Sequence, residues 1–121
     1  MLKGSLYSVV SVDQSEGSIA AELMLNADND IFKGHFPGQP VLPGACMLQI
    51  LKEVLEDALN KKLRLKKADQ MKFLLPVDPG KSRALKLSIA YVIESDIYAV
   101  TAAMNTAEGP CFKFKGSFVV K

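Results

Sequence analysis

The segment that decides how this chain folds runs Gly34-His35-Phe36-Pro37-Gly38-Gln39-Pro40-Val41-Leu42-Pro43-Gly44. It contains the only histidine of the 121-residue chain, together with three prolines and three glycines. Proline fixes a backbone dihedral and glycine reaches conformations closed to other residues, so this composition predicts a loop of one defined shape. An apolar helical pattern begins directly after it. The sequence therefore favours a single imidazole placed by a rigid loop at the entrance of a helix.

The helix is expected to begin at Pro43-Gly44 and to continue to about Asn60. Proline suits the first turn of a helix, because its missing N–H would have no partner there. Apolar residues recur at helical spacing and predict a broad apolar face: Met47, Leu48, Ile50, Leu51, Val54, Leu55, Ala58 and Leu59. Such a helix must be covered, and the rest of the chain offers only strand patterns.

Two strands are expected before the helix and four after it. The first two are Gly4–Val12 and Ser18–Leu25, and the later four are Gln70–Leu75, Ala84–Ile93, Ile97–Thr106 and Cys111–Val120. The last strand is expected to place Phe112, Phe114, Phe118 and Val120 on one face and Lys113 and Lys115 on the other. Short turns between strands favour antiparallel pairing. One helix with one sheet predicts a single α+β domain over residues 1–121, with a curved sheet wrapped around the helix.

Composition excludes several classes of protein. Hydrophobic residues make up 49% of the chain, and the net charge of +2 is too small to indicate nucleic-acid binding. No apolar run approaches the ~18 residues of a membrane span, and the N-terminus lacks the apolar region of a signal peptide, so a cytoplasmic location is expected. Cys46 and Cys111 fit no metal or disulfide spacing and are expected to be reduced, buried thiols. The basic run has no interleaved aromatic residues and is expected to be a solvated surface: Lys61, Lys62, Arg64, Lys66 and Lys67.

The segment Gly34–Gly44, followed by an apolar helix, resembles the signature of the 3-hydroxyacyl-acyl-carrier-protein dehydratases of fatty-acid synthesis, which have the hotdog fold. A second stretch, Lys72–Gly80, resembles the strand and turn that follow the helix in that family. The order of the expected elements also matches, so the resemblance covers essentially the whole chain. It implies elimination of water from a 3-hydroxyacyl thioester to give a trans-2-enoyl thioester, in fatty-acid or related polyene and lipid synthesis.

The resemblance implies roles for individual residues. His35 matches the family base, and a neutral imidazole can accept the C2 proton near pH 7. Gly44 matches the backbone N–H that stabilises the developing oxyanion, at a helix N-terminus whose amides lack intrahelical partners. The same loop supplies the expected substrate-binding residues: Phe36, Pro37, Gly38, Val41, Leu42 and Pro43. No metal and no organic cofactor is implied. Asn29 and Asp30 are expected to cap a short turn and are assigned no role in the site.

Position 49 departs from the family pattern. The family has a glutamate or aspartate fourteen residues after the histidine, whereas this chain has Gln49, which cannot release a proton. Gln49 could position a water or the substrate hydroxyl, or Glu53, one helical turn further, could replace the lost acid. Alternatively the protein binds acyl thioesters without dehydrating them. Gln49 could also simply begin a polar stripe that continues through Glu53, Glu56 and Asn60.

The expected partners follow from the same resemblance. An acyl carrier protein bearing a 3-hydroxyacyl chain is the implied substrate carrier, and the basic run with Lys113 and Lys115 could dock this acidic partner, although a merely solvated surface is an equal alternative. Family members are at least dimers, so a homodimer is expected, with a trimer of dimers as a further possibility. Two alternatives to a dehydratase stay open: a hotdog thioesterase, and a non-catalytic acyl-thioester-binding subunit that pairs with an active relative.

Overall fold

The computed structural model describes residues 1–33 and 40–121 of the chain. The elements follow one another as two strands, a short 3-10 helix, one long helix and four strands. In chain order they are β1 (Tyr7–Ser15), β2 (Ser18–Leu25), η1 (Asp30–Phe32), α1 (Gly44–Leu59), β3 (Leu63–Phe73), β4 (Ala84–Glu94), β5 (Ile97–Thr106) and β6 (Gly109–Val120).

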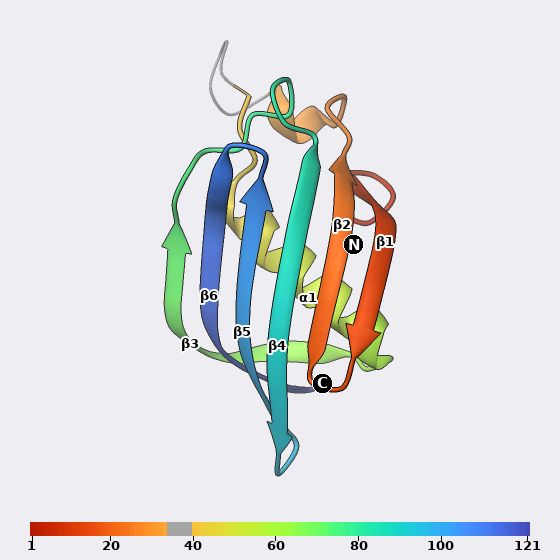
Figure 1. Ribbon diagram of the computed structural model, residues 1–121, viewed down its shortest axis with the longest axis vertical. Coiled ribbons are helices and arrows are strands. Elements are labelled where there is room, and N and C mark those ends of the chain that lie inside the picture. The colour runs from red at the N-terminus through yellow and green to blue at the C-terminus, as the bar shows by residue number, and fades with distance from the viewer. Residues whose placement is uncertain (34–39) are drawn as a thin grey trace.

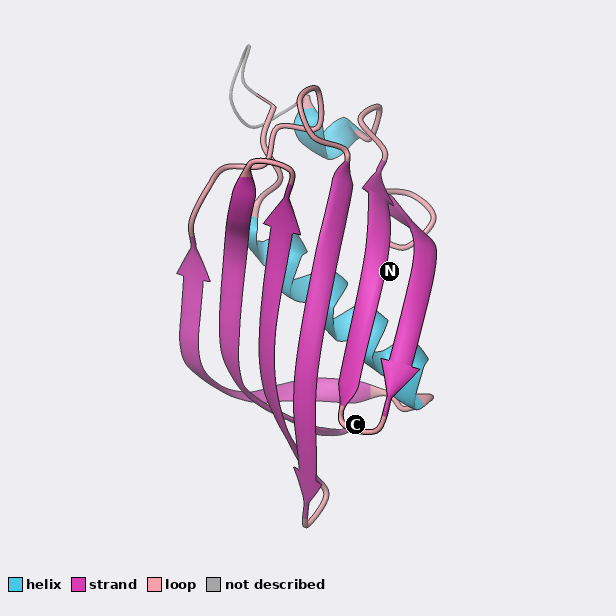
Figure 2. Cartoon of the chain, in the orientation of Figure 1, coloured by secondary structure: helices cyan, strands magenta, loops and turns pink. Residues whose placement is uncertain are grey.

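The six strands form one antiparallel sheet in the order β1-β2-β4-β5-β6-β3. The sheet curves around α1, which crosses only one of its faces (Figures 1 and 2). β1 and β3 are the two edge strands, and β3 bends sharply along its length as it follows the curve of the sheet (Figure 1). This is the α+β architecture expected from the sequence, and it is the hotdog fold.

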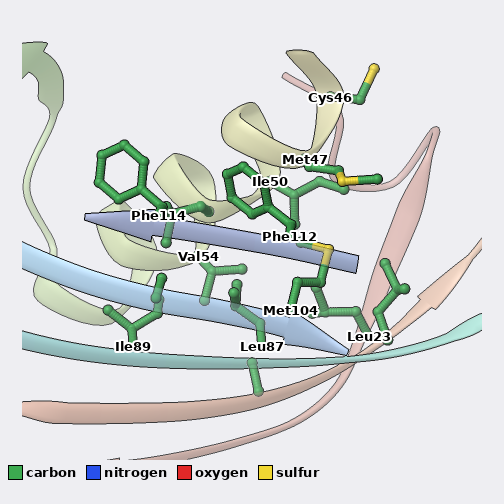
Figure 3. Close-up of a cluster of buried hydrophobic side chains, with 14 of the residues drawn as sticks. Leu23, Cys46, Met47, Ile50, Val54, Leu87, Ile89, Met104, Phe112 and Phe114 are labelled. Atoms are coloured by element: carbon green, nitrogen blue, oxygen red, sulfur yellow. The ribbon is translucent and has the colours of Figure 1, made fainter. Parts of the chain in front are cut away.

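The core lies between α1 and the concave face of the sheet. β2 and β4 alternate between buried and exposed residues along most of their length, as half-buried strands do. From the helix, Met47, Ile50 and Val54 point into this space, where they meet side chains of β2, β4, β5 and β6 (Figure 3). Phe112, Phe114 and Phe118 of β6 are buried as expected, while Val120, at the end of that strand, is 46% exposed.

The first strand is shifted from its expected position. β1 begins at Tyr7 rather than at Gly4, and it continues to Ser15 rather than ending at Val12. Residues 2–7 form a tight turn in which Gly4 has a φ of +92°, with its N–H bonded to the Tyr7 carbonyl. Leu6 at the end of this turn is fully buried. The apolar composition that indicated a strand thus reflects burial of a turn against the core.

The strand after the helix is also longer than expected. β3 covers Leu63–Phe73, whereas the sequence predicted Gln70–Leu75. Three of the five residues of the basic run, Arg64, Lys66 and Lys67, therefore lie in an edge strand. This strand pairs with β6, with register shifts near Lys67 and Gln70. The residues of the basic run are exposed as expected. Every residue of β3 except Leu63 is exposed, so no buried face imposes the period-two pattern by which strands are recognised.

The ends of the helices agree with the sequence. Pro43 is the N-cap of α1, and Asn60 ends the helix in the left-handed conformation, with φ 53°. The Asn29 side chain accepts a hydrogen bond from the Ile31 N–H at 2.9 Å and caps η1 as predicted. Cys46 and Cys111 are buried free thiols. Among the described residues, no helix is both long and apolar enough to cross a membrane.

Candidate functional site

The two stretches that resemble the dehydratase family meet at the N-terminus of α1. The Leu42 N–H donates to the Val77 carbonyl at 2.8 Å, which joins the end of the first stretch to the second. Beside this contact lies a mostly apolar cavity of about 420 Å³, a size typical of small-molecule sites. Its walls come from both stretches and from the first helical turn: Val41, Leu42, Gly44, Ala45, Met47, Phe73, Leu74, Leu75 and Pro76.

The helix N-terminus at this cavity has backbone donors to offer. The Pro43 carbonyl accepts hydrogen bonds from the N–H groups of Cys46 and Met47. Those of Gly44 and Ala45 donate to no group within the part of the chain that the structure describes. Unpaired N–H groups and the helix dipole together favour negative charge at this end of α1. The arrangement can therefore stabilise an anionic oxygen beside the cavity.

Gly44 is required by its neighbour Phe73. A Cβ atom at position 44 would lie 2.7 and 2.8 Å from ring carbons of Phe73. The Phe73 ring is itself held by stacking on Phe112, with 5.3 Å between ring centroids. The aromatic ring therefore occupies the space that a side chain at position 44 would need. Phe73, 51% exposed, thus forms a wall directly over the start of the helix.

Gln49 lies one turn beyond Ala45 on the same face of α1, since residues four apart are neighbours on a helix. Its side-chain Nε2 donates a hydrogen bond of 2.8 Å to Oε2 of Glu53, a further turn along. Glu53 accepts three more donors: the N–H groups of Leu2 and Lys3, at 2.9 Å each, and the Tyr7 hydroxyl at 3.1 Å. The candidate acid position is thus tied through Glu53 to the N-terminal turn.

Glu53 is not part of a solvated polar stripe, because its side chain is only 1% exposed. Burial alone would raise the pKa of its carboxyl group, but the hydrogen bonds from Leu2, Gln49, Lys3 and Tyr7 outweigh burial and lower that pKa. Glu53 is therefore ionised at neutral pH. Its ionised state and its occupied oxygens argue against the alternative that Glu53 replaces the missing acid.

The other predicted site residues divide into two groups. Val41 and Leu42 line the cavity, while Pro43 serves as the N-cap of α1 and is not among the lining residues. His35, Phe36, Pro37 and Gly38 lie outside the described residues, so their roles stay predictions from the sequence. Five further residues line the cavity but were not predicted from the sequence as site residues: Met47, Phe73, Leu74, Leu75 and Pro76. All except Met47 belong to the second stretch that carries the family resemblance.

The two thiols do not offer a nucleophile. Burial raises the pKa of the Cys46 thiol and raises that of Cys111 to about 11, so both remain protonated near neutral pH. Across residues 1–33 and 40–121, no cluster of three His, Cys, Asp or Glu side chains could hold a metal ion.

A larger hollow of about 690 Å³ lies on the sheet face remote from α1. It is lined mainly by small side chains such as Ala20, Ser88 and Ala90 and is bordered by Lys113 and Lys115.

The curved antiparallel sheet around one helix, with an apolar cavity at the N-terminus of that helix, defines a hotdog protein. The model of the ApeI-like family, described as ApeI dehydratase, matches residues 11–110. The chain therefore belongs to the ApeI-like dehydratase family.

Individual relatives agree with this assignment. Over 91% of the chain and 67% of the relative, the sequence is 27% identical to the 3-hydroxyacyl-[acyl-carrier-protein] dehydratase FabZ of Caulobacter sp. strain K31. It is 31% identical to FabZ of Chlamydia trachomatis serovar L2, over 69% of the chain and 61% of the relative. The chain thus spans about two thirds of the length of these curated dehydratases.

A solved structure shows the same fold. The dehydratase heterocomplex ApeI:P from Xenorhabdus doucetiae matches with a TM-score of 0.78 and 22% sequence identity, over 92% of this chain and 96% of that chain. The hotdog fold implied by the sequence is therefore confirmed.

Proposed function

We propose that the protein acts on 3-hydroxyacyl thioesters carried by an acyl carrier protein and eliminates water to give the trans-2-enoyl thioester. One observation carries the proposal: the two stretches that resemble the dehydratases form one apolar cavity at a helix N-terminus, where the N–H groups of Gly44 and Ala45 donate to none of the described residues. The acyl chain would lie in this cavity, with the thioester oxygen near the Gly44 N–H. Membership of a dehydratase family supports the same reaction.

The proposed chemistry assigns one task to each group. The imidazole of His35 removes the C2 proton, and the Gly44 N–H with the helix dipole stabilises the negative charge that grows on the thioester oxygen. Gln49 holds the 3-hydroxyl group, since an amide can hydrogen-bond but cannot protonate a leaving group. The proton for the departing hydroxyl therefore comes from the imidazolium that the first step creates. Phe36, Pro37, Gly38 and Pro43 are expected to shape the loop around the substrate.

A second candidate function is binding without turnover, in a subunit that pairs with an active relative. Gln49 favours it, because losing a positioned acid typically costs ~10²–10⁴-fold in rate. The heterocomplex among the structural relatives is consistent with such a pairing. A hotdog thioesterase is a third possibility, and it would need water as its nucleophile because both thiols are protonated.

The proposed partners are a second copy of this chain and the carrier protein. β3 is an edge strand whose side chains are almost all exposed, which suits pairing with another copy. Basic residues are gathered along β3 and β6, where Lys72 lies opposite Lys113. This surface is suited to an acidic carrier protein. A cytoplasmic location belongs to the same proposal.

The test is turnover of 3-hydroxyacyl carrier-protein substrates of several chain lengths, with products identified by mass spectrometry. We expect enoyl product from the wild type and from Ser88→Ala, a matched control on the remote sheet face, but none from His35→Ala. Free fatty acid instead of enoyl product would establish the thioesterase. Saturable binding with no product at any chain length would establish the binding subunit.

A further inference from the structure

The Gln49 amide faces Glu53 in one orientation only. An ionised carboxylate has no hydrogen to donate, so the group that approaches Oε2 of Glu53 at 2.8 Å must be the NH₂ group of the amide. The carbonyl oxygen Oε1 of Gln49 is then directed to the opposite side of the amide. Oε1 accepts no hydrogen bond from the described residues, and Gln49 is half-buried. Gln49 is not itself a lining residue of the cavity, but it lies one helical turn from Ala45, which is.

Glu53 is itself held in place from several directions. The N–H of Leu2 donates to both oxygens, to Oε2 at 2.9 Å and to Oε1 at 3.1 Å. Oε1 also accepts from the N–H of Lys3 and from the Tyr7 hydroxyl, and Oε2 also accepts from Gln49. One turn further along α1, the Lys3 ammonium pairs with Asp57 at 3.1 Å. The N-terminal turn is also fastened at Ser5, whose carbonyl accepts from the side-chain amides of Asn26 and Asn29 at 3.0 Å.

Burying a carboxylate costs free energy unless its charge is well compensated. Three of the four donor groups that compensate Glu53 come from the N-terminal turn and β1, and these alone would explain an anchor for the chain end. The fourth donor is Gln49, and its bond has a second effect, because it fixes which atom of the amide remains available. A carboxylate that is held by several donors and stays ionised at neutral pH is a stable reference for that orientation.

We infer that Glu53 is a positioning residue that turns the Gln49 amide so that its carbonyl oxygen accepts a hydrogen bond from the 3-hydroxyl group of the acyl ligand. This inference rests on the proposed function for the nature of the ligand. It gives position 49 a defined chemical preference: a ligand that donates a hydrogen at C3 is favoured over one that only accepts. A 3-hydroxyacyl chain meets this requirement, and a 3-oxoacyl chain of the same length does not.

Two probes that differ only at C3 test the preference by binding. They are the pantetheine amides of a 3-hydroxyacyl and a 3-oxoacyl chain of equal length, because the amide makes C2 less acidic than in a thioester and so suppresses loss of water. The wild type is expected to bind the hydroxy probe about five- to tenfold more tightly, the value of one well-made hydrogen bond. Titration calorimetry gives both dissociation constants without any need for turnover.

Glu53→Gln should remove the preference. With its oxygen at the position of Oε1, the new side chain can accept from Leu2, Lys3 and Tyr7. Its NH₂ group then lies at the position of Oε2 and faces Gln49, so the Gln49 amide must rotate by half a turn. The ratio of the two dissociation constants then falls to about one or reverses. Tyr7→Phe is the matched control, since it removes one donor from the same carboxylate without touching Gln49 and should keep the wild-type ratio.

The possible outcomes separate the inference from the proposed function. Equal binding of both probes by the wild type overturns the inference, and so does loss of the preference in both Glu53→Gln and Tyr7→Phe, which would mean a purely structural anchor. If Glu53→Gln does not fold, Gln49→Leu replaces it and must also lose the preference. A preference that behaves as expected in a protein without turnover would keep the inference and reject the dehydratase.

Discussion

At the scale of single residues, the contact between Gln49 and Glu53 makes position 49 sensitive to charge. The two side chains are 2.8 Å apart, so Gln49→Glu would place two carboxyl groups within hydrogen-bond distance. Like charges this close cannot both ionise easily, and the pair keeps one shared proton to a higher pH than two isolated glutamates would. Tyr7 stays protonated beside them, because burial and the Glu53 charge raise its pKa.

We expect the free energy of unfolding of Gln49→Glu to fall relative to wild type as the pH rises above the ordinary glutamate pKa of about 4.3. In that range the folded variant binds more protons than its unfolded chain, so rising pH destabilises it. In the wild type the pKa of Glu53 is lowered, so its contribution is complete above that pH and is lost only on acidification. Urea unfolding at about pH 5 and about pH 8 measures the difference.

The double variant Gln49→Glu, Glu53→Gln is the control, because it has a single carboxyl group beside an amide. Its stability relative to wild type should not decline as the pH rises between the two measurements. The proton retained by Gln49→Glu should also let position 49 act as an acid, so that turnover exceeds that of the wild type. A stability difference for the single variant that is the same at both pH values would contradict the shared proton.

At the scale of elements, the sequence predicted the bounds of those helices and strands that have a buried face. The helix and the last three strands are found within about three residues of their predicted ends. In each of them the spacing of apolar residues, alternating in a strand or helical in the helix, indicates which side meets the core. β3 was predicted too short because almost all of its residues are exposed, so its sequence has no alternation of apolar and polar residues. The N-terminal turn was mistaken for a strand because Leu6 and Tyr7 are buried by packing that no local pattern reveals.

The pairing of β3 with β6 depends on Gly116. A Cβ atom at Gly116 would collide with the Lys67 carbonyl and lie 2.7 Å from the Phe114 ring, at the place where β3 is irregular. Gly116→Ala is therefore expected to lower the free energy of unfolding by about 1–3 kcal/mol, the usual cost of overpacking. Urea unfolding measures it, with the neighbouring Ser117→Ala expected to change stability by less than about 0.5 kcal/mol. Equal stability of Gly116→Ala and wild type would show that β3 can move aside without cost.

At the scale of the whole molecule, the candidate site joins segments that are far apart in the chain. The sequence predicted the segment around Gly34–Gly44 and position 49 because each lies within or directly after a recognisable motif. It could not predict that Glu53 binds the backbone of Leu2 and Lys3, about fifty residues away, since any residue type supplies a backbone N–H. Contacts of this kind depend on how the N-terminal turn packs against α1 and are visible only in the folded chain.

The free edge at β3 leads to a prediction about assembly. Leu65, Met71 and Phe73 lie opposite the buried residues Phe118, Phe114 and Phe112 of β6, so they belong to the face that carries α1. Yet these three β3 residues are 37%, 40% and 51% exposed, because in the single chain nothing covers them completely. A long edge strand with exposed apolar side chains is a template for pairing with another chain. A second copy placed along β3 would cover this face next to the cavity wall formed by Phe73.

We therefore expect the protein to sediment as a homodimer and Met71→Glu to sediment as a monomer, because a charge on the covered face must be buried unpaired in the dimer. Val12→Glu is the matched control: Val12 lies on the opposite edge strand β1, across from the buried Ala21, and is 44% exposed against 40% for Met71. If the copies pair through β3, the control remains a dimer. If Val12→Glu dissociates while Met71→Glu stays dimeric, the interface lies at β1 instead of β3. A monomeric wild type would contradict the predicted homodimer. The position of this interface decides whether a second copy can reach the cavity, since only the β3 edge borders it through Phe73.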